Sequence, residues 1–328
     1  MLNKNSIVHK WMQRYGRLYL CLLVVATLTS CGGGRRQDVH FNRFEQFLFS
    51  QKSDYKPADF RTNLINFNPE DTAYLRALDD FRSDEVVYDI YRITDSLYHD
   101  IRWLERDLGG ALARLSELCP DIRYDGFYTM VTADIDDYRN RVFCNDHELA
   151  VSLDHYAVGN MERYQYFGLP AYIIALSTRE HIAADCMAAI AREHIVLPEG
   201  QLTMLDYIVA EGKVMWLLEK TLPHTPDSIL LRYSSAQLDW MKHNTANVWA
   251  WLIENRMIYS TDYALLRNFI DDAPKTNAFG DGSAPRTVAY IGWQIVGRYM
   301  KKSGASAAEL LEETDSQKIL TISGWRPK

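Results

Sequence analysis

Three side chains of kinds that bind metal ions lie where a hydrolytic site could form. His181 and Asp185 are four residues apart in a segment with helical spacing, and Glu211 follows in the next such segment. Residues four apart on a helix face the same way, and imidazole and carboxylate groups are common zinc ligands. Ile182, however, stands where a general base would be needed. A helical His–Asp pair is more simply a helix-stabilising contact, and Glu211 could pair with Lys213 or with a neighbouring helix. We therefore predict no metal or other cofactor and keep the three positions as a candidate degenerate metal site.

Other chemical motifs are missing from the sequence or have structural explanations. The sequence contains no HExxH helix, no G-x-S-x-G turn, no P-loop and no dinucleotide-binding fingerprint. Paired carboxylates such as Asp271-Asp272 are interpreted as solvated helix caps. The indoles of Trp240, Trp249 and Trp251 could form a sugar-stacking platform, but a core-facing stripe is the favoured interpretation. No catalytic residue is assigned, and the prediction leans against an enzyme.

Two glycines interrupt an otherwise helical segment near the C-terminus. Gly292 and Gly297 each lower helix propensity by about 1 kcal/mol relative to alanine. We expect both of them to serve close helix packing.

The N-terminus predicts where the protein resides. Four basic residues precede an apolar run that begins at Leu18, and the run ends in Leu28-Thr29-Ser30-Cys31. A basic, then apolar, then small-residue order is typical of a secretory signal peptide, and Leu18–Ser30 is too short to span a bilayer. The last four residues resemble a lipobox, so we expect cleavage before Cys31 and lipidation of its thiol. Gly32-Gly33 brings no acidic residue after this cysteine, which favours the outer over the inner membrane.

Charge and cysteine content narrow the function further. The signal segment holds four of the 36 basic residues and none of the 43 acidic ones, so the remaining chain has a net charge of about −11. Such a surface repels phosphate backbones, and nucleic-acid binding is not expected. The cysteines that remain beyond Cys31 are Cys119, Cys144 and Cys186. One disulfide or free thiols are both open possibilities.

Hydrophobic periodicity divides the chain into helical and extended parts. Helical spacing is seen at Phe41, Phe44, Phe47 and Leu48, and then in one long stripe over 71–118. Short β-branched and aromatic runs predict three strands at 126–132, 138–144 and 148–153. Further helices are predicted over 171–195, 201–221, 234–257, 261–270 and 284–301.

These elements predict an α+β fold that is mostly helical, with a small antiparallel or mixed sheet of about three strands. The predicted organisation is a signal peptide with lipobox over 1–30, a tether and N-terminal docking segment over 31–70, and a single domain over 71–328.

A series of short motifs, in a fixed order, resembles the gliding-motility-associated lipoprotein B family of Bacteroidetes. The likeness runs from about Phe41 to the C-terminus. The motifs that carry it are Arg43-Phe44-Glu45, Val151-Ser152-Leu153-Asp154-His155-Tyr156, Leu169-Pro170-Ala171-Tyr172, Ala210-Glu211-Gly212-Lys213, Gln237-Leu238-Asp239-Trp240 and Ile291-Gly292-Trp293-Gln294-Ile295-Val296 with Tyr299.

The resemblance implies a cell-envelope lipoprotein linked to gliding motility and its associated secretion machinery, with envelope proteins as partners. It also implies a distant zincin-like relationship, in which the helix of His181 and Asp185 stands where HExxH would, and Glu211-Gly212 where the third ligand would. Without the signature, we expect a scaffold that acts by binding. The alternatives are a metal-dependent peptidase or hydrolase with an altered zinc site, and a glycan- or peptidoglycan-binding lipoprotein.

Overall fold

The computed structural model describes residues 36–50, 57–135, 137–145, 147–161 and 168–327. From Gln37 onward the chain forms one compact unit. The predicted signal peptide and Cys31 lie outside the described residues. Within the described ranges no helix combines the length and the apolar character that crossing a bilayer requires. Cys119, Cys144 and Cys186 are free thiols.

A small mixed sheet in the described part has the strand order β1-β2-β4-β3. β1, β2 and β4 run parallel, and β3 is antiparallel to β4. The strands are β1 Asn42–Arg43, β2 Gly126–Met130, β3 Val142–Asn145 and β4 Glu148–Ser152. The prediction of a mostly helical protein with a small mixed sheet is therefore confirmed, with one strand more than expected.

The additional strand comes from the segment that we expected to be helical from Phe41. Helix α2 (Phe44–Phe49) begins only after β1. Arg43, on β1, pairs with Thr129 on β2, and its Nε donates to Glu45 Oε1 over 2.5 Å. The Glu45 carboxylate also accepts from Thr129 Oγ1, and Arg43 Nη2 donates to the carbonyl of Tyr98. This buried pair fixes the N-terminal segment to the sheet.

The long helical stripe over 71–118 is broken into three helices, α3 (Thr72–Ser83), α4 (Glu85–Tyr98) and α5 (Arg102–Leu118). Asp84 ends the first and caps the second, because its side chain accepts the Val86 and Val87 amides. The helix predicted over 171–195 is likewise divided into α7 (Ala171–Leu176) and α8 (Arg179–His194).

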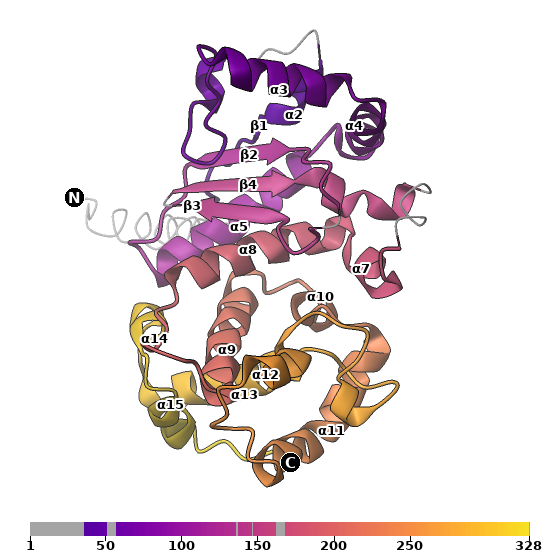
Figure 1. Ribbon diagram of the computed structural model, residues 1–328. Helices are drawn as coiled ribbons and strands as arrows, with labels where there is room; N and C mark the ends of the chain where they lie inside the picture. Colours follow the sequence, from indigo (N-terminus) through magenta and orange to yellow (C-terminus); the bar gives the residue numbers. More distant parts are fainter. Residues whose placement is uncertain (1–35, 51–56, 136, 146, 162–167, 328) are drawn as a thin grey trace, which may run out of the picture. The chain divides into compact units, whose positions relative to one another are not determined.

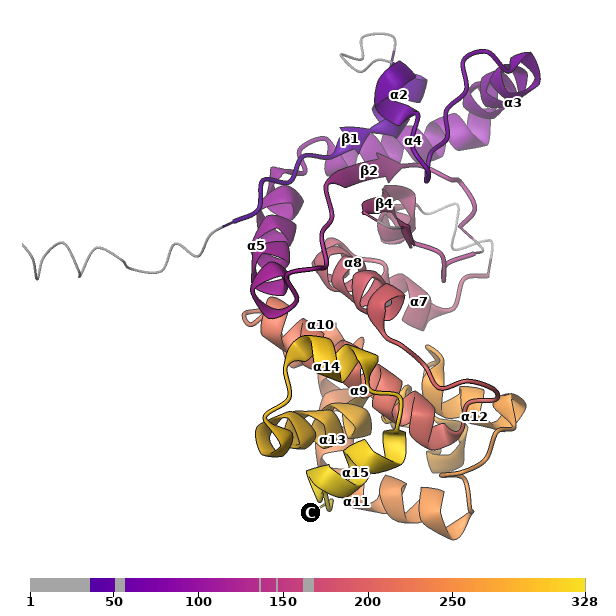
Figure 2. The same ribbon diagram turned by 90° about the vertical axis from the view of Figure 1, so that its left-hand side faces the viewer.

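The remaining helices form a layer on the other side of α8 from the strands, as Figures 1 and 2 show. The short helices α10, α14 and α15 were not expected from the sequence. The bounds are α9 Met204–Thr221, α10 Asp227–Leu231, α11 Ser235–Glu254, α12 Tyr263–Ile270, α13 Thr287–Ser303, α14 Ala307–Glu312 and α15 Ser316–Ser323.

Helices α9 and α13 cross with their backbones in contact. A Cβ atom on Gly292 would lie 1.9 Å from the carbonyl oxygen of Ile208, and one on Gly212 would lie 2.4 Å from the Gly292 carbonyl group. Only glycine fits at either position, so the prediction of close packing is confirmed for Gly292. It is wrong for Gly297, where an added Cβ would meet no atom within 4 Å.

The tryptophans of α11 pack against other aromatic rings. Trp249 meets Trp325 edge to face at 5.2 Å, Trp251 lies 5.4 Å from Phe269, and Trp240 lies 5.8 Å from Phe279. All three indoles are only partly buried and pack against the main core. All three indoles therefore contribute to core packing, as the core-stripe interpretation expected.

Candidate functional site

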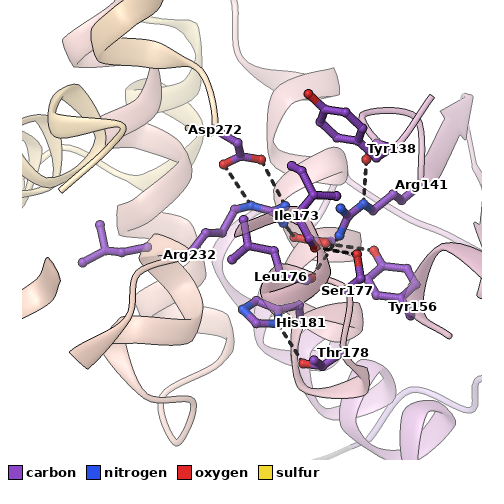
Figure 3. Close-up of polar contacts among 12 residues, drawn as sticks. Tyr138, Arg141, Tyr156, Ile173, Leu176, Ser177, Thr178, His181, Arg232 and Asp272 are labelled. Atoms are coloured by element: carbon purple, nitrogen blue, oxygen red, sulfur yellow. Dashed lines mark hydrogen bonds and ion pairs between the residues drawn. The ribbon is translucent and has the colours of Figure 1, made fainter. Parts of the chain in front are cut away.

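The three candidate metal positions lie on two neighbouring helices. His181 and Asp185 are on α8, and Glu211 is on α9. The described residues that line the pocket between these helices include Asp185 and Glu211 but not His181. His181 is buried, and its Nδ1 lies 3.1 Å from Thr178 Oγ1 at the start of α8 (Figure 3). Burial lowers the pKa of His181. The structure thus brings together two of the three side chains.

The pocket has a volume of about 390 Å³ and a strongly charged lining. Its walls also carry apolar side chains from α8, α9 and α10, among them Ala184, Val214, Met215, Leu218 and Leu230. The charged lining residues among those described are Arg139, Arg141, Arg192, Arg232, Arg286, Asp185, Glu211, Asp271 and Asp272.

Asp185 is held by an arginine that follows α10. Arg232 Nη1 donates to Asp185 Oδ1 over 2.5 Å. Arg232 Nη2 lies 3.1 Å from Asp272 Oδ2 (Figure 3). The hydroxyl of Tyr156 donates to Asp185 Oδ2 over 2.9 Å. Burial alone would raise the pKa of Asp185, but Arg232 and Arg141 outweigh it and the pKa is lowered. The carboxylate is therefore ionised, and each of its two oxygens accepts a hydrogen bond.

The expectation that the Asp271-Asp272 pair forms a solvated helix cap is wrong for Asp272. Its carboxylate belongs to the pocket and shares Arg232 with Asp185. Burial opposes its ionisation, yet Arg232 and Arg286 lower its pKa to about 2.

Glu211 is held between two further arginines. Arg286 Nη2 donates to Glu211 Oε2 over 2.9 Å, and Arg192 Nη2 donates to the same oxygen over 3.1 Å. Burial would raise the pKa of Glu211, but Arg192 and Arg286 together lower it. The expected alternative of pairing with a neighbouring helix is confirmed, because Arg192 lies on α8. Pairing with Lys213 is not observed, because the Lys213 ammonium donates to the carbonyls of Leu311 and Glu313 instead.

This arrangement does not suit a zinc ion. Within the described ranges, no group of three or more His, Cys, Asp or Glu side chains is placed to hold a metal. Asp185 and Glu211 direct their oxygens at guanidinium groups, which repel a cation and occupy the lone pairs that a metal would need. Carboxylates with lowered pKa values are also poor general bases near neutral pH.

Arg141 differs from the other arginines of the pocket. It lies just before β3, is only 3% exposed, and donates from Nε to the Tyr138 carbonyl and from Nη1 to the Leu176 carbonyl, at 2.6 and 3.0 Å (Figure 3). Its guanidinium lies 5.6 Å from the ring of Tyr156. Its Nη2 has no hydrogen-bond partner among the described residues. Burial, followed by the charge of Arg232, lowers the pKa of Arg141.

No sequence pattern identified Arg232 or Arg286 as a site residue. Arg232 and Arg286 stand outside the helices, at backbone φ angles of 61° and 45°. This left-handed conformation is uncommon for residues other than glycine and is often associated with functional sites. No spacing rule links either residue to α8 or α9.

Several of the short motifs seen in the sequence converge on this region. Tyr156 contacts Asp185, Glu211 lies in the pocket, and Gly212 meets Gly292 one residue further along α9. Asp154 instead accepts the backbone amide of Ala133 over 2.9 Å and so shapes the loop that follows β2.

A family model described as gliding motility protein GldB matches residues 34–327. The matched range contains the sheet, the helical layer and every residue that lines the pocket. No curated protein and no solved structure matches the chain.

Proposed function

Since the chain belongs to the gliding motility protein GldB family of lipoproteins, we propose that it acts by binding, without catalysis, in a motility or associated secretion assembly of the cell envelope. Family membership implies membrane anchoring. In this proposal the anchor is acyl chains on Cys31, and the outer membrane is favoured because Gly32 and Gly33 bring no acidic residue after that cysteine.

One observation supports binding over catalysis. Each of the two carboxylates in the pocket that could have served a metal is neutralised by arginines: Asp185 by Arg232, and Glu211 by the buried Arg286 and the exposed Arg192. Guanidinium groups here supply the positive charge that a metal ion would otherwise bring. The proposal includes a zincin-like ancestry for this part of the fold, with α8 and α9 in the places of the two ligand-bearing helical segments.

The metal content of the native protein tests this proposal. The full-length lipoprotein, purified from envelopes in an uncharged detergent, is expected to contain no stoichiometric zinc. Stoichiometric zinc that disappears in both His181→Ala and Glu211→Ala, and persists in the control His243→Ala on the exposed part of α11, would establish the altered-site hydrolase instead.

Partner capture provides the positive test. Crosslinking in intact envelopes is expected to join the wild-type protein to other envelope proteins. Replacing Arg232 with methionine is expected to weaken this capture, while the exposed Arg256→Met variant keeps it. Equal capture by the wild type and the Arg232 variant would contradict a binding role for the pocket.

A further inference from the structure

The pocket contains one more arginine than its carboxylates can neutralise. Every carboxylate in the described lining has an arginine partner: Asp185 and Asp272 with Arg232, Glu211 with Arg286, and Asp271 with Arg139 at 3.5 Å. Arg141 is the arginine of this lining without a carboxylate partner among the described residues.

The surroundings of Arg141 make an unpaired charge costly. The side chain is almost fully buried, two of its nitrogens donate to carbonyl groups, and Nη2 donates to no described residue. A buried charged donor without a partner carries a desolvation penalty that a bound anion would remove. A guanidinium group matches the two oxygens of a carboxylate especially well.

We propose that the pocket binds a small organic acid, with a single carboxylate received by Arg141 and an apolar group against the helices. A single negative charge balances the one arginine in excess, whereas a phosphate dianion would face the lining carboxylates Asp185, Glu211 and Asp272. The apolar side chains Val214, Met215 and Leu230 provide the wall for the rest of the molecule. A volume of about 390 Å³ lies in the range of small-molecule sites.

Binding requires a small turn of the guanidinium group. Nη2 is closed to solvent, although Arg141 lines the pocket, so this nitrogen must rotate toward the ligand. Such a rotation would break the hydrogen bond from Nη1 to the Leu176 carbonyl, and a hydrogen bond to the bound carboxylate would replace it.

The test uses N-acetyl-leucine, whose free carboxylate and apolar side chain represent the proposed class. Calorimetry with the full-length protein in an uncharged detergent is expected to show binding at least about tenfold tighter than that of N-acetyl-leucinamide, which lacks the charge. Inorganic phosphate is expected to bind more weakly than N-acetyl-leucine. Arg141→Gln is expected to weaken carboxylate binding about tenfold or more.

Arg267→Gln is the matched control, because Arg267 carries an equal charge close to the pocket, at 3.5 Å from Asp271, but does not belong to its described lining. The effect of Arg267→Gln on binding is expected to stay within about threefold, as for an exposed arginine. If Arg141→Gln does not fold, NMR of arginine-labelled wild-type protein decides: the carboxylate should shift the guanidinium signal of Arg141, and the amide should not.

The inference rests on the proposed non-catalytic, metal-free function, and the two can fail separately. A metal-free protein with equal affinity for acid and amide, or with unchanged binding in Arg141→Gln, overturns only the organic-acid site. Phosphate binding tighter than carboxylate overturns the choice of ligand class. Stoichiometric zinc in the pocket overturns both proposals.

Discussion

Replacing Arg232 with methionine should be among the most destabilising single changes in the pocket. The substitution keeps a long side chain and the same strained backbone position, but it leaves Asp185 and Asp272 without their shared partner. The Arg232 side chain is 13% exposed and that of Asp185 15%. Removing one partner of a buried ion pair typically costs about 3–5 kcal/mol in unfolding free energy.

The pKa of Asp272 gives an independent measure of the stabilisation that Arg232 contributes to. Its folded value of about 2, against an ordinary value of 3.8, corresponds to about 2 kcal/mol of stabilisation. Because the folded pKa is depressed, this stabilisation is present above about pH 4 and is lost as the pH falls toward 2. Arg232 is the largest influence that lowers the pKa of either carboxylate, so both pKa values are expected to rise in the variant.

The unfolding free energy of the Arg232→Met variant should therefore differ most from that of the wild type near neutral pH. Urea denaturation, followed by tryptophan fluorescence, measures the unfolding free energy of both proteins at pH 7 and pH 4.5. At pH 4.5 the carboxylates of Arg232→Met are partly protonated, so the difference from the wild type should shrink. Arg267→Met is the control, because Arg267 is half exposed and lies 3.5 Å from Asp271. It should cost no more than about 0.5 kcal/mol.

Two results would refute this reasoning. A loss below about 1 kcal/mol at pH 7 would mean that Arg232 is not the charge that neutralises the two carboxylates. If the difference in unfolding free energy between variant and wild type grew on acidification, burial would not be raising the pKa values of the variant's carboxylates.

Three further predictions concern other parts of the chain. Gly292→Ala should destabilise by several kcal/mol, since its Cβ would meet the Ile208 carbonyl, whereas Gly297→Ala should stabilise by about 0.5–1 kcal/mol; thermal melting of both compares them directly. Burial lowers the pKa of Lys213 to about 8, so the unfolded state binds more protons than the folded state above this pH, and the free energy of unfolding should rise by about 2 kcal/mol between pH 8 and about 10. Denaturation of Lys213→Met should lack this rise. Cys31→Ala should no longer partition into a detergent phase, and persistent partitioning would contradict lipidation of that residue.

The sequence predicted the fold class because apolar spacing and short β-branched runs are local signals. It did not predict β1, because a strand of two residues carries no period, and its pairing with Tyr128 and Thr129 depends on contacts far along the chain. The break at Asp84 was signalled by a cap-type residue, but the apolar stripe continued across it and masked the boundary.

The candidate site was only half predictable for a related reason. Asp185 and Glu211 stood out by residue type, yet what they do is decided by Arg232 and Arg286, which are 47 and 75 residues distant along the chain. Those arginines lie outside the regular helices, where no periodicity describes the direction of a side chain. The sequence therefore identified the acidic side of the pocket but not its basic side.

The contact between Gly212 and Gly292 has a consequence for the pocket as well as for the core. Glu211 precedes one of these glycines on α9, and Arg286 precedes the first residue of α13, so the crossing fixes the distance between the two helices that carry this ion pair. A single methyl group inserted at the crossing would push the helices apart and widen the pocket near the pair. The width available to a bound molecule is thus determined by two residues that have no side chains and never touch it.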